Sequence, residues 1–147
     1  MSTYHKLHYH LIFGTKKKQP FLNADIRPRL WSYMAGTISG LGGTPRIIGG
    51  WIDHVHVLLD LKPAHDMTAI VREVKKASTP WLREAAAIPN FSWQEGYAVF
   101  TVGYHGMDVI HRYIERQEEH HRKKTYQEEL IEFLEEAGVD YDPKFLP

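Results

Sequence analysis

Strand-length apolar segments alternate with helix-length amphipathic segments along this chain, and that alternation most constrains its fold. Residues 7–13 alternate apolar and polar side chains, which is typical of a strand with one face against a core. Between residues 26 and 38 an apolar side chain instead recurs every four positions, as on one face of a helix. The expected order is strand 7–13, helix 23–42, strand 46–48, strand 54–61, helix from 66, strand 97–102, helix 108–124 and helix 126–137. This order predicts an α+β sandwich with helices packed mainly on one face of an antiparallel sheet.

Local signals refine these elements. Strands 46–48 and 54–61 are close enough in the chain to form a hairpin, and Asp66 is suited to cap the helix that follows them. Pro80 then falls inside that helix, where a proline removes a hydrogen bond. We therefore predict a break there, with Thr79 as a new cap and Pro80 as the first residue of a second segment. Asp108 is the expected cap of the third helix.

Composition limits the classes of protein and site. The 147 residues, 43% of them hydrophobic, suffice for a single domain with a buried core. The absence of cysteine excludes disulfides and thiolate metal sites. Apolar runs such as 55–59 are too short to cross a bilayer, and the first residues lack the apolar core of a secretion signal, so a cytoplasmic protein is expected.

The zero net charge conceals a charge asymmetry. Residues 1–127 carry 17 Lys and Arg against 11 Asp and Glu, whereas residues 128–147 carry 1 against 7. The basic part permits a phosphate-bearing partner. The acidic C-terminal segment, residues 126–147, is expected to be a solvated helix and tail.

A histidine pair, His54-Val55-His56, is the first candidate for chemistry. Alternate side chains of a strand share a face, so both imidazoles are expected to point the same way. Two imidazoles at this spacing are a common half of a metal site. His8 and His10 have the same spacing, however, so spacing alone does not single out either pair.

A tyrosine and a glutamine form the second candidate. Tyr113 and Gln117 are four residues apart on the expected third helix and therefore share one face. The simpler interpretation is a core-packed tyrosine with a glutamine at the rim. The functional one is a phenol nucleophile beside an amide ligand. A phenol with the ordinary pKa of about 10 is a poor nucleophile, so a cation that polarises a phosphate would be needed.

Other side chains suit a nucleic acid partner. Trp51, Trp81 and Trp93 could stack on unpaired bases, although core packing is the more common role of tryptophan. The histidines near the third helix, including His120 and His121, are expected to be surface or phosphate-contacting residues rather than a second metal site. The basic side chains expected to follow a DNA backbone are Lys16, Lys17, Lys18, Arg72, Lys75, Lys76, Arg112 and Arg116.

Taken in order, these motifs resemble a known family. The run Asp53-His54-Val55-His56-Val57-Leu58-Leu59 resembles the His-hydrophobic-His ("HUH") motif of single-tyrosine transposases. The runs at 93–102 and 113–121, and the opening His-Leu-Ile-Phe-Gly-Thr-Lys at 10–16, resemble other parts of the same proteins. The family is the short single-strand insertion-sequence transposases, which include the REP-associated tyrosine transposases.

The resemblance implies a ferredoxin-like fold and a single transposase domain over residues 1–147. It implies that Tyr113 is the nucleophile of a 5′-phosphotyrosine intermediate that leaves a free 3′-hydroxyl. It also implies that His54, His56 and Gln117 hold Mg²⁺ or Mn²⁺. The expected partners are hairpin-containing single-stranded DNA and a second copy of the chain, in a homodimer whose tyrosine helix can complete the partner's site.

Two other functions stay open at this point. One is a domesticated, non-catalytic module that only binds single-stranded nucleic acid. The other is a small metal-dependent phosphoesterase that uses water, although Leu58 stands where a histidine-triad hydrolase would need a further histidine. Gly103-Tyr104-His105-Gly106 also departs from the small hydroxyl residues that are usual in the family at this place.

Overall fold

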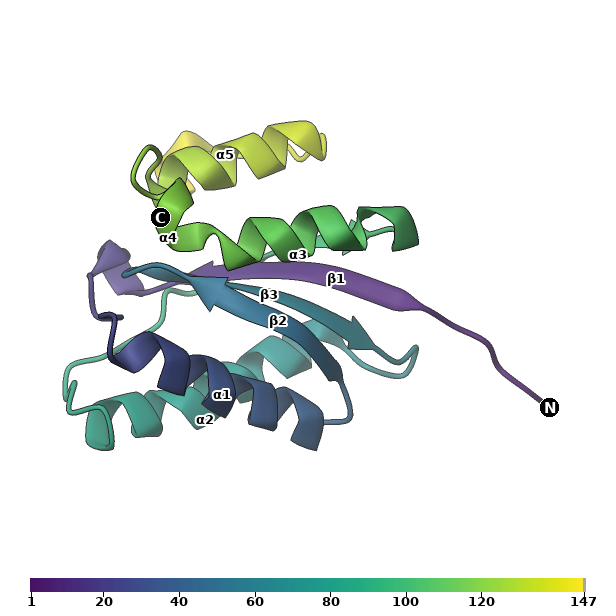
Figure 1. The fold of residues 1–147 in the computed structure, drawn as a ribbon, viewed down its shortest axis with the longest axis horizontal. Helices are drawn as coiled ribbons and strands as arrows, with labels where there is room; N and C mark the ends of the chain where they lie inside the picture. The colour runs from purple at the N-terminus through teal and green to yellow at the C-terminus, as the bar shows by residue number, and fades with distance from the viewer. Residues whose placement is uncertain (147) are drawn as a thin grey trace.

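A four-stranded antiparallel sheet in the order β2-β3-β1-β4 forms the middle layer of the computed structural model (Figure 1). The structure describes residues 1–146; Pro147, the end of the expected acidic tail, lies outside them. The strands are β1 (Leu7–Gly14), β2 (Thr44–Gly50), β3 (His54–Leu61) and β4 (Ala98–Val102). The helices are α1 (Ile26–Gly40), α2 (Met67–Glu84), α3 (Met107–Glu115), α4 (Gln117–His120) and α5 (Tyr126–Glu136). The predicted α+β class, the antiparallel sheet and the β2–β3 hairpin are confirmed.

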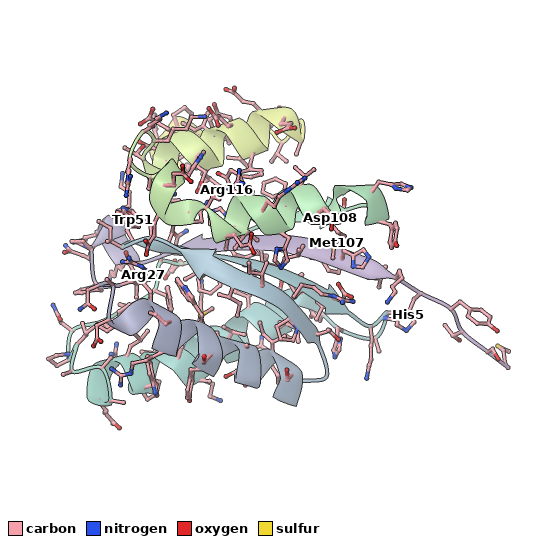
Figure 2. The ribbon with its side chains drawn as sticks, viewed as in Figure 1. His5, Arg27, Trp51, Met107, Asp108 and Arg116 are labelled. Carbon is pink, nitrogen blue, oxygen red and sulfur yellow. The ribbon has the colours of Figure 1, made fainter. Side chains whose placement is uncertain are left out.

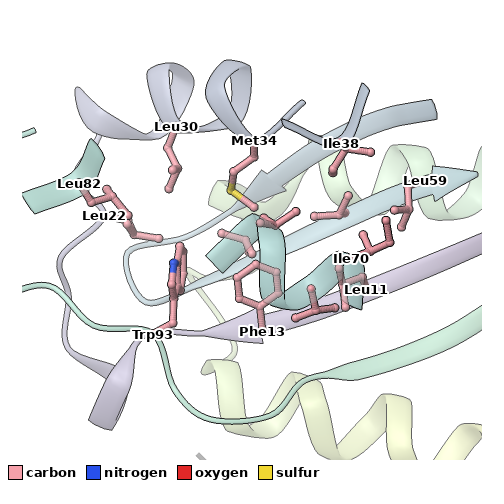
Figure 3. Packing of buried hydrophobic residues seen from close by; sticks show 14 of the residues in the cluster. Leu11, Phe13, Leu22, Leu30, Met34, Ile38, Leu59, Ile70, Leu82 and Trp93 are labelled. Atoms are coloured by element: carbon pink, nitrogen blue, oxygen red, sulfur yellow. The ribbon is translucent and has the colours of Figure 1, made fainter. Parts of the chain in front are cut away.

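Helices cover both faces of this sheet, whereas the sequence predicted them mainly on one. Helices α1 and α2 lie on one face, and the C-terminal helices α3, α4 and α5 lie on the other (Figure 1). Leu11 and Phe13 of β1 point into the larger core, where Leu30 and Met34 of α1 pack (Figure 3). Ile12, one position along from Leu11, instead packs in a second cluster beneath α5. The two-residue period of the strand therefore divides β1 between two buried layers.

Helix α2 runs through Pro80 without the predicted break. Asp66 caps it as expected, because its carboxylate accepts a hydrogen bond from the Thr68 N–H at 2.9 Å. Val74 and Leu82, one on each side of the proline, are both fully buried. Their burial stabilises the continuous helix enough to offset the single hydrogen bond that the proline removes.

The third expected helix is divided into two. Asp108 lies within the first turn of α3 rather than at its cap, so that part of the prediction is wrong. Arg116 has φ −98° and ψ 22°, which ends α3, and Gln117 begins the short helix α4. In Figure 2 Arg116 lies at this junction and Asp108 at the other end of α3.

The C-terminal helix α5 is not the solvated helix that its charge suggested. Thr125 and Glu128 form a reciprocal capping box at its start, and Gly138 with φ +70° follows its end. Leu130 and Leu134 are buried against the sheet, together with the carboxylate of Glu129. The apolar stripe of α5 therefore outweighs its charge. Among residues 1–146, no helix has both the length and the hydropathy to span a bilayer.

Candidate active site

The histidine pair lies on the sheet face that α3, α4 and α5 cover. His54 and His56 alternate along β3 with Val55, which points into the opposite core. Both imidazoles are completely buried. The two histidines of the second pair contact different residues: His8 Nδ1 lies 2.6 Å from Asp60 Oδ1, and His10 Nε2 lies 2.8 Å from His56 Nδ1. Structural context, not spacing, distinguishes the two pairs.

Gln117 approaches His54 because α3 packs very closely on β2. A Cβ at Gly49 would lie only 2.6 Å from the backbone oxygen of Ile114, so glycine is needed at this contact. The first residue of α4 then reaches the histidines, with Gln117 Oε1 3.2 Å from His54 Nε2. The structure thus brings together the three predicted metal ligands.

Tyr113 lies beside the histidines of its own chain. Its ring centroid is 5.7 Å from that of His56, and its hydroxyl donates a hydrogen bond to Glu129 Oε2. The hydroxyl also lies 3.1 Å from His120 Nε2. Burial and the neighbouring Glu129 carboxylate raise the pKa of Tyr113, so the phenol stays protonated in this arrangement.

Glu129 is the central residue of the site, and the sequence analysis missed it. Its Oε1 lies 2.7 Å from His56 Nε2 and 3.1 Å from His54 Nε2, and Gln117 Nε2 donates to its Oε2 at 3.0 Å. The sequence did contain an indication that Glu129 is buried. Glu129 falls on the same helix stripe as Tyr126 and Leu130, where an apolar residue would be expected.

His121 is also part of the site, so its expected surface position is wrong. Its side chain is 1% exposed, and its Nε2 lies 2.9 Å from Gln117 Oε1. The Trp51 ring lies nearly parallel to it, with centroids 6.3 Å apart. The Arg27 guanidinium lies over Trp51 and donates to Glu118 of α4 at 2.8 Å (Figure 2). These contacts hold the segment that carries Gln117 and His121.

The electrostatics of the site favour a positive charge beside Glu129. Burial opposes the Glu129 carboxylate, but His56 and hydrogen bonds from the histidines hold its pKa well below the usual range. Burial likewise opposes charge on His54, yet hydrogen bonds to Asp53 and Glu129 outweigh it and raise the His54 pKa. Burial lowers the pKa of His56 to about 4, so this imidazole is neutral and able to act as a ligand.

The three predicted ligands fit a divalent cation. The Asp53 carboxylate accepts a hydrogen bond from His54 Nδ1 at 2.8 Å, which directs Nε2 of the same ring toward Gln117 Oε1, where a cation could displace the Nε2 proton. A carboxylate behind a coordinating histidine is the usual outer support of a metal site. More broadly, His54, His56, His121 and Glu129 offer donor atoms within 4.8 Å of one another.

The basic side chains predicted to contact DNA are spread over both faces. Residues 16–18 form an exposed 3-10 turn after β1, and Arg112 and Arg116 belong to the α3 side. Residues 72–76 belong to α2 on the opposite face. There the Lys75 ammonium donates to the backbone oxygens of Gln94 and Gly96, so it is engaged within the protein.

The tryptophans contribute mainly to packing. Trp93 lies in the larger core, and its indole N–H donates to Ser78 Oγ at 2.9 Å. Trp81 stacks on Tyr33 with ring centroids 5.3 Å apart. The core-packing interpretation therefore holds for these two, while Trp51 supports the site through His121.

The fold and the site define an α+β protein in which a tyrosine-bearing helix covers a histidine pair on an antiparallel sheet. The family described as transposase, IS200-like, matches residues 3–117, which is most of the chain. The chain therefore belongs to the IS200-like transposases, a family of DNA-cleaving enzymes.

Individual relatives agree with this assignment. The ISDra2 transposase TnpA of Deinococcus radiodurans is 28% identical over 120 residues, which cover 77% of this chain and 85% of the relative. A crystal structure assigned as a transposase from Deinococcus radiodurans R1 has a TM-score of 0.63 at 29% identity, covering 80% of this chain and 95% of that one. A REP-associated tyrosine transposase bound to a REP hairpin shares the fold, with a TM-score of 0.58 at 18% identity over 82% of this chain and 74% of that one.

Proposed function

We propose that this transposase cleaves and rejoins single-stranded DNA through Tyr113. The phenol oxygen forms a bond to phosphorus, the bond from phosphorus to the 3′ oxygen breaks, and the released 3′-hydroxyl takes up a proton. The result is a 5′-phosphotyrosine link and a free 3′-hydroxyl, which rejoins strands in the reverse reaction. One observation carries the proposal: Tyr113 donates to the same buried carboxylate that contacts both histidines.

Each residue of the site has a distinct role in this reaction. The hydrogen bond to Glu129 orients the Tyr113 oxygen toward the histidines and gives its proton a defined exit at Oε2. His54, His56 and Gln117 would hold Mg²⁺ or Mn²⁺. When bound, such an ion polarises the phosphate and stabilises the negative charge that develops on it. Because burial keeps Tyr113 protonated, the phenol has to lose its proton as the new bond forms.

We propose hairpin-containing single-stranded DNA as the substrate. A relative with the same fold is bound to a REP hairpin, which supports this choice. The exposed basic residues 16–18 follow the end of β1, where Gly14 pairs with His54 across the sheet, and are suited to contact a nucleic acid backbone. The homodimer and the cytoplasmic location stay predictions.

The test is covalent capture of DNA. A fluorescent hairpin oligonucleotide with single-stranded flanks is incubated with the full chain and Mn²⁺, and the protein–DNA adduct is separated on a denaturing gel. Tyr113→Phe should lower the adduct at least about 10³-fold, because phenylalanine lacks the attacking oxygen. Tyr104→Phe is the matched control: this side chain is 77% exposed, and adduct formation should be unchanged.

The alternatives give other outcomes. Equal adduct from Tyr113→Phe would refute the assignment of the nucleophile. Hairpin binding without any adduct, unaffected by a chelator or by His56→Ala, would identify a binding module. Turnover of a small phosphodiester by water, with no trapped link, would identify a phosphoesterase.

A further inference from the structure

Two side chains outside the family match point into the site. The match ends at residue 117, and His121 and Glu129 come after it. We propose that both are additional ligands of the divalent cation, and that the enlarged donor set selects Mn²⁺ over Mg²⁺. This inference rests on the proposed function only for the presence of an ion at His54 and His56.

The spacing of the donor atoms supports coordination by this larger set. Ligand atoms at about 2.1 Å from an ion lie about 3.0 to 3.4 Å from their neighbours in octahedral or tetrahedral geometry. Glu129 Oε1 is 3.1 Å from His54 Nε2 and 2.7 Å from His56 Nε2. His121 Nε2 is 2.9 Å from Gln117 Oε1 and 3.3 Å from Glu129 Oε2. The donors are therefore already spaced close to the edges of one coordination shell.

The orientation of the His121 ring also supports coordination of a cation by this residue. Its Nδ1 lies 2.7 Å from the backbone oxygen of Lys124, which only accepts hydrogen bonds, so Nδ1 carries the proton. The other ring nitrogen, Nε2, lies 2.9 Å from Gln117 Oε1 and 3.3 Å from Glu129 Oε2, so it is directed at the same centre as the other donors. His54 is arranged in the same way by Asp53. A cation at this centre would take the place of the protons that the histidines share with the neighbouring oxygens.

The chemical class of the ion follows from the donors. Mg²⁺ prefers oxygen ligands and retains several waters. Carboxylate and amide oxygens suit both ions, but imidazole nitrogen suits transition metals, of which Mn²⁺ is one and Mg²⁺ is not. With His54, His56 and His121 in the set, nitrogen makes up most of it, which favours Mn²⁺.

Coordination by Glu129 also couples the ion to α5. Leu130 and Leu134 already hold this helix on the sheet, and a ligand bond from Glu129 adds a direct link from the helix to β3. Binding of the ion should therefore slow hydrogen exchange of the α5 amides. Neither the selection of Mn²⁺ nor the slower exchange of α5 is expected if only His54, His56 and Gln117 bind the ion.

The experiment measures metal binding without DNA. Isothermal titration of the metal-free full chain should show Mn²⁺ binding at least about tenfold tighter than Mg²⁺. Glu129→Gln should weaken Mn²⁺ binding at least about tenfold and abolish the exchange protection of α5. Glu132→Gln is the matched control on the same helix, because its carboxylate is exposed and pairs with Lys124; it should bind Mn²⁺ as the unmodified chain does.

A second measurement covers the case in which Glu129→Gln unfolds. Pulsed EPR of the Mn²⁺-loaded chain counts the coordinating imidazoles, and His121→Asn should remove one of the three. Unchanged Mn²⁺ affinity in a folded Glu129→Gln protein, equal affinity for Mg²⁺, or an unchanged imidazole count in His121→Asn would overturn the inference. Adduct formation would then persist through Tyr113, so failure here is distinct from failure of the proposed reaction.

Discussion

Gly49 sets how closely α3 packs on the sheet, and Gly49→Ala tests that contact. A methyl group there would lie 2.6 Å from the Ile114 backbone oxygen and 2.8 Å from its Cγ2. Since atoms in contact need about 3.5 Å, the helix has to retreat by at least about half an ångström. Overpacking of this kind costs about 1–3 kcal/mol. We expect the free energy of unfolding in urea to fall by that amount.

The same displacement should weaken catalysis. Gln117 is three residues beyond Ile114, and its Oε1 is 3.2 Å from His54 Nε2, so a shift of α3 separates these atoms further. Misplacement of catalytic groups by about 1 Å can cost about 10²-fold, so we expect adduct formation to fall about tenfold or more. Gly36→Ala is the matched control in α1, because no atom lies within 4 Å of its added methyl group.

The stability and activity of the two variants together test whether this contact positions Gln117. Gly36→Ala should raise stability by about 0.5–1 kcal/mol, since alanine is the better helix residue. If Gly49→Ala instead unfolds at the same urea concentration as the unmodified chain and keeps full activity, then the contact between β2 and α3 does not position Gln117, and the reasoning is refuted.

Two further predictions concern stability. Leu134→Ala should lower the free energy of unfolding by about 2–3 kcal/mol, because the side chain is buried beneath α5; a loss under about 0.5 kcal/mol in a urea melt would mean that this helix is solvated after all. Burial opposes ionisation of Asp60, but hydrogen bonds from Arg46 and His8 outweigh it and hold the pKa of Asp60 below its ordinary value. The folded chain therefore binds fewer protons than the unfolded chain below about pH 4, and stability should fall as the pH drops through that range. Asp60→Asn should flatten this part of the stability–pH profile, and an unchanged profile would contradict the assignment.

The sequence predicted the elements of the fold well because their signals are local. Alternation in residues 7–13 and the cap at Asp66 depend on neighbours in the chain, and both are confirmed. The break predicted at Pro80 failed because burial of Leu82 is a tertiary effect. The end of α3 at Arg116 was missed for a related reason: no proline or glycine marks it, and the residues on both sides are held by contacts with other elements.

The site was predicted only in part. His54 and Gln117 were found through motif order, and the structure brings them together as expected. Glu129 was missed because its negative charge fitted the acidic tail, although its place on the stripe of Tyr126 and Leu130 indicated burial; the packing of α5 on the sheet shows that it faces His56, 73 positions earlier in the chain. The expected surface position of His121 failed for the same reason, since its burial depends on Trp51 and Gln117.

Strand β3 separates the larger core from the site: its valines line the core, and its histidines line the site. A shift of β3 by one residue relative to its neighbours would exchange these two sets of side chains. Both imidazoles would then enter the apolar core while valines faced Tyr113. The register of β3, which burial of both its faces specifies, is thus as much a determinant of activity as the residues that react.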